Sequence, residues 1–129
     1  MIDNNDGTVT DTRTNLMWQK ISPPGKKTWE QALECCNNLN LGGHSDWRLP
    51  NLKELISLVL RERGNPAVDI PVFPVRYSEF HWSSTVNDNK NYAWGMTFSY
   101  VGEYLYYKDL KGFYRAVRGE CVVPDLIHK

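Results

Sequence analysis

The chain has 129 residues, of which 41% are hydrophobic and 12% aromatic, and its 15 basic and 15 acidic side chains give a formal net charge of +0. This length and composition predict one globular domain over residues 1–129 and exclude a disordered chain. The balanced charge argues against nucleic acid or anionic lipid as a partner, and no apolar run approaches the roughly 20 residues of a membrane span. The polar residues 1–6 do not resemble a secretory signal, so we expect either a removed export signal or a cytosolic protein.

The first predicted element is a β-hairpin close to the N-terminus. Residues 5–11, NDGTVTD, open with a turn signature that β-branched residues follow, and residues 15–19, NLMWQ, are typical of the returning strand. Asp3, Asn5 and Asp6 resemble the start of a calcium loop, but the glycine of an EF-hand loop stands at its sixth position. Because Gly7 comes one place early, we expect a turn here and not a calcium site.

The clearest predicted helix begins at Thr28, whose hydroxyl can form a capping box with Gln31, and ends at residues 40–43. Cys36 lies in the middle of its apolar stripe and Cys35 at the flank, so Cys36 is the better candidate for an inward structural role. The stripe recurs at helical spacing and consists of Trp29, Ala32, Leu33, Cys36 and Leu39.

The segment GGHSDWRLP, residues 42–50, has the composition of an active site but is interpreted as a joint between two helices. In an extended link, Trp47 and Leu49 lie on one side, and we expect both side chains to be buried in the core. Asp46 and Arg48 share the other side, where hydrogen bonds to neighbouring backbone are expected to fix the turn.

A second helix is predicted directly after this joint. Asn51 can cap it, with Glu54 as the reciprocal partner, and Gly64 with the following Asn-Pro pair ends it. Residues 65–78 contain three prolines, which forbid a regular strand ladder, so this segment is predicted to be a long extended loop over the core. The apolar stripe of the helix consists of Leu52, Leu55, Ile56 and Val59.

The remainder of the chain is predicted to be β-structure. Its four short runs, separated by turn-rich segments, are residues 79–85, 91–98, 103–107 and 112–119. In the second run large side chains alternate with small ones, which is the period of a half-buried strand. The runs are interpreted as an antiparallel meander packed on the two helices, which is an α+β fold.

These segments, in this order, resemble the bacterial DUF1566 family, also called the C-terminal domain of the Legionella collagen-like adhesin. The resemblance covers nearly the whole chain and rests on DGTVTDTRTNLMWQ, TWEQALECCNNLNLGGHSDWRLPNLKEL, FHWSST and YRAVRG, of which SDWRLP and WSST are the most specific. It implies a C-type lectin-like fold with two helices, paired N- and C-terminal strands, and a long-loop region leading into an antiparallel sheet.

The resemblance also implies a disulfide. The family pattern usually has a cysteine in the first helix, where Cys36 stands, and another inside an Arg-Cys-Val-Arg motif in the last strand. Residues 115–118 read Arg-Ala-Val-Arg, so Cys121 is the expected substitute, paired with Cys36 or with Cys35. Such a bridge over a long loop contributes roughly 4 kcal/mol to stability. The alternative is three reduced thiols.

Residue types suited to catalysis are present without the arrangement that catalysis needs. His81 and Ser83 project to one face of a predicted strand, but no Gly-x-Ser-x-Gly elbow, zinc-ligand motif or phosphate loop accompanies them. The implied fold is related to formylglycine-generating enzymes, whose reactive cysteine pair is not supplied by Cys35, Cys36 and Cys121. We therefore expect a protein that is not an enzyme.

Calcium-dependent sugar binding is the next mechanism to consider for a lectin-like fold. C-type lectins of that kind resemble one another in a Glu-Pro-Asn or Gln-Pro-Asp loop and a Trp-Asn-Asp strand, whereas this chain has Gly-Asn-Pro at 64–66 and Trp-Ser-Ser at 82–84. No metal site and no cofactor are therefore predicted, with a weak calcium ion at residues 87–89 as the alternative to a simple turn.

The predicted ligand-binding surface consists of aromatic and amide side chains, which suit a glycan or a protein surface. Alternation puts Tyr104 and Tyr106 on one face of their strand and Leu105 and Tyr107 on the other, so one pair is expected in the core and the other exposed. The predicted site residues are Asn87, Asp88, Asn89, Asn91, Tyr92, Tyr104, Tyr106 and Tyr107.

Two functions are compatible with these patterns. The resembled adhesins are implied to bind sulfated polysaccharides, for which Lys108, Lys111, Arg115 and Arg118 are candidate cations, but the two arginines point to opposite faces and the net charge is zero. The first hypothesis is a recognition module for glycan or protein at the bacterial surface or in the periplasm. The second is a structural domain that terminates or trimerises a larger chain as a homo-oligomer.

Overall fold

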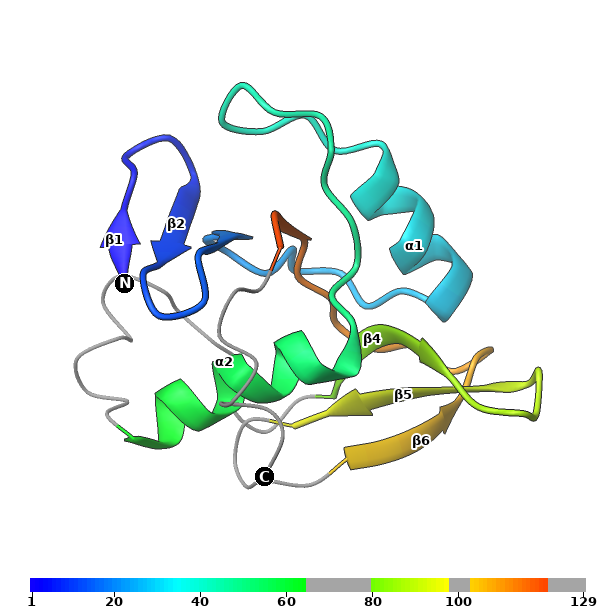
Figure 1. The fold of residues 1–129 in the computed structure, drawn as a ribbon. Helices are drawn as coiled ribbons and strands as arrows, with labels where there is room; N and C mark the ends of the chain where they lie inside the picture. Colours follow the sequence, from blue (N-terminus) through cyan, green and yellow to red (C-terminus); the bar gives the residue numbers. More distant parts are fainter. Residues whose placement is uncertain (65–79, 98–102, 121–129) are drawn as a thin grey trace.

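Two antiparallel sheets and two helices form the fold (Figure 1). The computed structural model describes residues 1–64, 80–97 and 103–120, with side chains only up to residue 58 in the second helix. The predicted α+β class is confirmed, and the predicted long loop, residues 65–78, lies outside the described residues. The elements are β1 (Ile2–Asp3), β2 (Thr8–Asp11), β3 (Leu16–Gln19), α1 (Trp29–Asn37), α2 (Leu52–Gly64), β4 (His81–Val86), β5 (Tyr92–Met96), β6 (Glu103–Tyr107) and β7 (Val117–Arg118).

The first sheet has the strand order β1-β2-β3-β7, so it joins the beginning of the chain to its last described strand. β2 and β3 form the predicted hairpin. Trp18 of β3 pairs with Val117 of β7, and both side chains are fully buried in one core cluster. This confirms the pairing of early and late strands that the family resemblance implies.

The second sheet contains three strands, β4-β5-β6, and not the four of the predicted meander. Residues 112–119, expected as the fourth strand, instead cross from one sheet to the other. The Phe113 N–H donates to the carbonyl of Phe80 (2.9 Å), and Val117 then exchanges two backbone hydrogen bonds of 2.9 Å with Arg48. This crossing buries Val117 against Trp18, which a position beside β6 does not allow.

Helix α1 begins as predicted and ends earlier. The Thr28 hydroxyl accepts from the Gln31 N–H, and the Gln31 side chain accepts from the Thr28 N–H, so the capping box is confirmed. The helix ends at Asn37. Gly42 (φ 62°) and Gly43 (φ 79°), expected to end it, form a separate tight turn in a conformation that residues with a Cβ rarely adopt.

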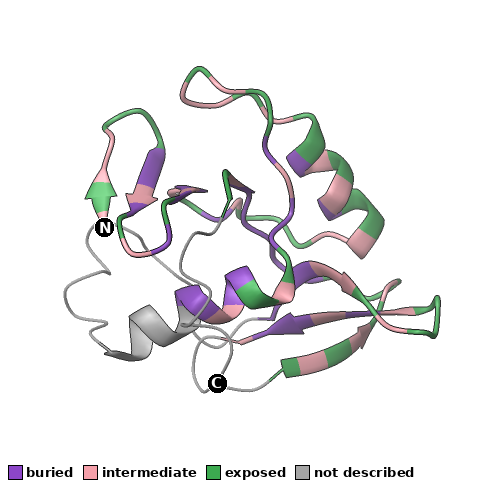
Figure 2. Ribbon diagram, viewed as in Figure 1, coloured by how far each residue is buried: buried purple, intermediate pink, exposed green. Residues whose placement is uncertain are grey.

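The joint at residues 42–50 connects both helices to the core, as predicted. Trp47 and Leu49 are each 2% exposed, and Figure 2 shows this part of the segment as buried. Asn51 and Glu54 form the second capping box: the Asn51 N–H donates to the Glu54 carboxylate (2.9 Å), and the Glu54 N–H donates to the Asn51 side-chain oxygen (2.8 Å). The start of α2 is therefore fixed by the burial of Trp47 and Leu49 before it and by the capping box of Asn51 and Glu54.

Two ion pairs, where backbone partners were expected, hold the polar side of the joint. Arg48 donates two hydrogen bonds of 2.7 Å to the Glu54 carboxylate and a third, also 2.7 Å, to the carbonyl of Gly119. Asp46 accepts two from Arg118, at 2.6 and 3.0 Å, and this contact lowers the pKa of Asp46. Hydrogen bonds to neighbouring backbone were expected; one is present, from Arg48 to the Gly119 carbonyl, and the other partners are the side chains of Glu54 and Arg118. The joint is thereby tied to α2 and to the end of β7.

The buried face of β5 carries its small residues. Gly95 lies against the ring of Phe80, and Ala93 belongs to the same core cluster. The Phe80 ring stacks on Tyr106 with a centroid distance of 3.7 Å and meets Trp82 edge-on at 5.0 Å. The rings of Tyr106 from β6, Trp82 from β4 and Phe80, which directly precedes β4, pack over the small residues of β5, which explains the alternation of large and small residues along this strand.

Candidate ligand-binding site

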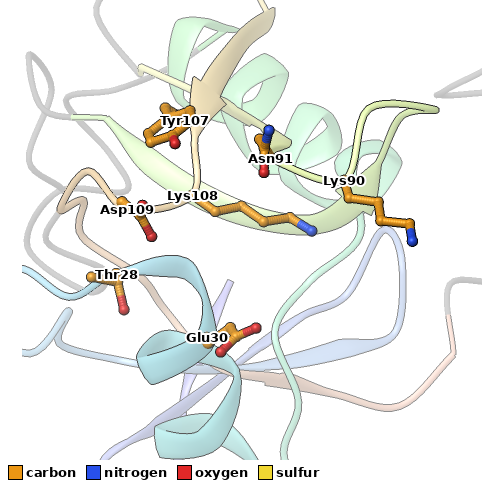
Figure 3. Close-up of a pocket in the computed structure, with 7 residues that line it drawn as sticks. All are labelled: Thr28, Glu30, Lys90, Asn91, Tyr107, Lys108 and Asp109. Atoms are coloured by element: carbon orange, nitrogen blue, oxygen red, sulfur yellow. The ribbon is translucent and has the colours of Figure 1, made fainter.

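A polar pocket opens where the start of α1, the β4–β5 turn and the end of β6 meet (Figure 3). Its volume is about 210 Å³. Figure 3 shows side chains from these three segments arranged around one space. The lining residues are Thr28, Glu30, Lys90, Asn91, Tyr107, Lys108 and Asp109.

Backbone hydrogen bonds hold the three segments of the pocket together. The Trp29 N–H donates to the carbonyl of Lys108 (3.2 Å), and the Lys108 N–H donates to the carbonyl of Asn91 (2.8 Å). Lys27 and Gly112 exchange two further bonds of 2.8 Å. The first turn of α1 is therefore fixed against the end of β6, which with the two residues after it supplies three of the seven lining residues.

One ammonium group of the pocket is positioned by an aromatic ring. The Lys108 Nζ lies 4.2 Å from the centroid of the Trp29 ring, within the range of a cation–π interaction. The Trp29 indole is itself held, because its N–H donates to the carbonyl of Ser83 at 2.9 Å. The ring that contacts the Lys108 ammonium group is therefore itself attached to β4.

An exposed aromatic surface borders the pocket. Tyr107 is 41% exposed and Leu105, on the same face of β6, is 37% exposed. The Tyr107 ring meets Tyr92 of β5 edge-on, with centroids 5.6 Å apart. Tyr107 belongs both to the pocket lining and to the exposed aromatic surface, so a bound molecule can contact its ring and the polar pocket at once.

The predicted residues of the β4–β5 turn fall into two groups. Asn91 lines the pocket, whereas Asn87, Asp88 and Asn89 do not. The Asn87 side-chain oxygen accepts from the Asn89 N–H (3.0 Å), and the Asn89 side-chain oxygen accepts from the Asn91 N–H (2.9 Å). These amides therefore shape the turn that presents Asn91, which is how asparagines commonly act in turns.

The predicted tyrosines of β6 are divided by the alternation of the strand. Tyr104 and Tyr106 pack against the core cluster, and Tyr106 stacks on Phe80. Tyr107 and Leu105 face outward, so the expectation of one inner and one outer pair is confirmed. Tyr104 and Tyr106 support the sheet beneath the site, and Tyr107 is the member that lines the pocket.

Several pocket residues could not be predicted from the sequence, because their neighbours in the pocket are far away along the chain. Thr28 was identified only as a helix cap, and Lys108 only as a candidate cation for polyanions. Their neighbourhood depends on backbone bonds between residues about 80 positions apart, such as those of Lys27 and Gly112, for which the sequence carries no local signal. The residues absent from the prediction are Thr28, Glu30, Lys90, Lys108 and Asp109.

The arginines considered for polyanion binding lie elsewhere. Arg115 is 2% exposed and donates to the carbonyl of Lys20 (3.1 Å). Arg118 is engaged by Asp46. Neither guanidinium lines the pocket, so they do not form a cationic cluster with Lys108.

The His81 and Ser83 pair belongs to the core of the sheet. Both residues are at most 1% exposed. The Ser83 hydroxyl donates to the carbonyl of Trp94 at 2.6 Å, which joins β4 to β5. These side chains therefore act in packing.

In the part of the chain that the structure describes, no three His, Cys, Asp or Glu side chains are grouped to hold a metal ion.

The two neighbouring cysteines of α1 differ in environment. Both are thiols, and Cys36 is fully buried whereas Cys35 is half-buried. Burial, with a smaller effect from Cys35, raises the pKa of Cys36 to about 12. This confirms Cys36 as the inward residue. Cys121, its predicted disulfide partner, lies outside the described residues, so that pairing stays a prediction.

We expect Cys36 to resist alkylation in the folded, reduced protein. The thiolate is the reactive form of cysteine, and burial both disfavours it and blocks the reagent. At pH 8, iodoacetamide labelling of Cys36, followed by mass spectrometry of peptides, should be at least a hundredfold slower than in urea. Labelling of Cys36 as fast as Cys35 in the folded protein would contradict the placement of its side chain.

Comparison with known proteins adds one match. The family model described as the Lcl C-terminal domain matches residues 7–118, which include every lining residue of the pocket. A comparison with curated proteins gives no match. Within the described residues, no helix is long and apolar enough to cross a membrane.

Proposed function

The chain belongs to the Lcl C-terminal domain family, a module of collagen-like adhesins, and from that premise we propose that it is a non-catalytic recognition module. Its ligand is a glycan or a protein, bound at the bacterial surface or in the periplasm. The observation that carries this proposal is the polar pocket bordered by the exposed ring of Tyr107. Flat aromatic area beside hydroxyl, amide and charged groups is the combination that recognition surfaces use.

The dimensions of the pocket suit one unit of a longer ligand better than a whole small molecule. Its volume of about 210 Å³ is below the roughly 300–1,000 Å³ of pockets that enclose a whole drug-sized ligand. It therefore suits one unit of a longer ligand. A sugar ring places its apolar face on Tyr107, and its hydroxyls reach Asn91 and the charged side chains.

We expect Tyr107→Ala to weaken glycan binding at least tenfold, because it removes the aromatic surface next to the pocket. The variant should keep its stability, since Tyr107 is 41% exposed. A glycan array with and without calcium identifies a ligand, and titration calorimetry then compares the affinities. Leu105→Ala is the matched control, because Leu105 lies on the same face of β6 without lining the pocket.

The structural alternative makes the opposite prediction in the same experiment. If the exposed face of β6 joins identical copies, Leu105→Ala and Tyr107→Ala should both shift the mass measured in solution towards the monomer. Equal affinity of Tyr107→Ala and the unmodified protein for the identified glycan would overturn the proposed site. A stable oligomer with no glycan binding would overturn the proposed function.

A further inference from the structure

We propose that Trp29 is a positioning residue of the recognition site: its ring holds the Lys108 ammonium group at the pocket, and Lys108 contributes more to ligand binding than the lysines around it. Trp29 does not itself line the pocket, whereas Lys108 does. This inference rests on the proposed function and deepens it, because it assigns the charged anchor of the site and the residue through which that anchor is held.

Lys108 differs from the neighbouring lysines in its surroundings and not in its charge. It is half-buried, whereas Lys90, the other lysine of the pocket lining, is exposed. Lys26, Lys27 and Lys111 are close to the pocket segments along the chain, but none of them lines it. An exposed lysine loses rotamer freedom when a ligand fixes it, and a lysine that the protein already holds loses less. The same charge therefore contributes more to affinity at Lys108.

Two contacts join Trp29 to Lys108. The Trp29 backbone N–H donates to the Lys108 carbonyl at 3.2 Å, and the Lys108 Nζ lies 4.2 Å from the centroid of the Trp29 ring. Tryptophan is the aromatic residue that binds a cation most strongly. An ammonium group has three N–H donors, so a ring on one side leaves donors for a ligand on the other. Figure 3 shows the Lys108 side chain between Asn91 and Glu30, with Lys90 at the edge of the group.

Both partners of this contact are attached to the same sheet. The Trp29 indole N–H donates to the carbonyl of Ser83 in β4 at 2.9 Å. The Lys108 backbone N–H donates to the carbonyl of Asn91, directly before β5, at 2.8 Å. Ring and lysine are thus fixed to neighbouring strands, which keeps the ammonium group in place relative to the rest of the pocket lining.

A second lysine–aromatic pair in the protein provides an internal comparison. The Lys26 Nζ lies 5.6 Å from the centroid of the Phe113 ring, close to the limit of about 6 Å for a cation–π interaction. A phenyl ring has no N–H with which to be anchored, Lys26 is exposed, and it lies outside the pocket lining. Lys26 therefore has a similar type of contact without the position that binding requires.

The first test is NMR of the free protein, which needs no ligand. The ring current of Trp29 should shift the ε-methylene protons of Lys108 upfield of those of Lys90. The shift should disappear in Trp29→Leu and persist in part in Trp29→Phe, which keeps a ring and loses the bond to Ser83. Coincident Lys108 and Lys90 signals in the unmodified protein would overturn the positioning role of Trp29.

The second test is titration calorimetry with an O-sulfated tetrasaccharide as the probe, the ligand class that the family resemblance implies. Lys108→Gln should weaken binding at least tenfold, and Lys90→Gln should weaken it less. Lys26→Gln and Lys111→Gln are the controls and should each change the affinity by less than about twofold. Equal losses for Lys108→Gln and Lys26→Gln would overturn the special role of Lys108.

A double-mutant cycle tests whether Trp29 acts through Lys108. Trp29→Leu should weaken binding of the probe about fivefold in the unmodified background and no further in the Lys108→Gln background. A role of Trp29 in packing alone would weaken binding equally in both backgrounds, and that result would overturn the inference. Trp29→Phe in the same two backgrounds gives the coupling if Trp29→Leu does not fold.

The outcomes separate this inference from the proposed function. Binding of uncharged glycans alone would leave the glycan-binding module in place and overturn the anchor role of Lys108. Absence of binding to the probe and to every glycan of the array would overturn the proposed function and the anchor role together.

Discussion

Arg48→Ala is expected to lower the free energy of unfolding by about 3 kcal/mol. The substitution removes three hydrogen bonds of 2.7 Å and leaves the Glu54 carboxylate, whose side chain is only 5% exposed, without its cation. Breaking a buried ion pair from one side typically costs 3–5 kcal/mol. The lower end applies here, because the Arg48 side chain is 37% exposed and water can reach part of the vacated space.

Urea unfolding of a small set of variants measures this effect. Asp46→Ala breaks the neighbouring pair with Arg118, but the Asp46 side chain is 63% exposed, so its effect should be much smaller. The double variant Arg48→Ala, Glu54→Gln should be more stable than Arg48→Ala, because it no longer leaves a buried negative charge unpaired. Equal losses for Arg48→Ala and Asp46→Ala would contradict the assigned roles.

The sequence predicted the joint correctly where the signal was local. Trp47 and Leu49 alternate with polar neighbours, and both are buried. Asn51 and Glu54 stand at the spacing of a capping box, and that box is present. The partner of Arg48 was missed, since Glu54 already had a local role and the sequence does not show that one carboxylate serves both a cap and an ion pair.

The candidate site was predictable only in part, for a related reason. Period-two alternation separates the outward Tyr107 from the inward Tyr106, and a turn-forming pattern places Asn91 next to β5. Glu30 enters the pocket only because α1 lies against the end of β6. That contact joins distant parts of the chain and depends on the packing of Trp29, which periodicity alone assigns to the core.

The crossing of residues 112–119 shows the same limit in the fold. Its side-chain pattern is that of a strand, and Val117 does form one. Which sheet it joins depends on whether Val117 is buried beside Trp18 or beside β6. The packing of the whole core determines which sheet the strand joins. The prediction of a four-stranded meander therefore identified a strand near Val117 correctly but paired it with β6, whereas it pairs with β3.

Gly95→Ala is expected to destabilise the protein by 3 kcal/mol or more, on the order of the largest effects of overpacking. A Cβ at this position collides with the carbonyl oxygen of His81 and with Cζ of Phe80. The carbonyl belongs to the paired strand β4 and cannot move without breaking the β4–β5 ladder. The ring of Phe80 is held by its stack on Tyr106, so neither neighbour can yield at low cost.

Thermal and urea unfolding of Gly95→Ala should be compared with those of Gly25→Ala, where no atom lies within 4 Å of the added Cβ. The control should lie within about 0.5 kcal/mol of the unmodified protein, which is usual for surface substitutions. Adding Phe80→Ala to Gly95→Ala should not restore stability, because the collision with the His81 carbonyl persists and the aromatic stack is lost. A stable Gly95→Ala variant would mean that β4 and β5 are not paired in this register. Tyr107 pairs with Tyr92 of the same strand β5, so this substitution also tests the sheet that positions the proposed site.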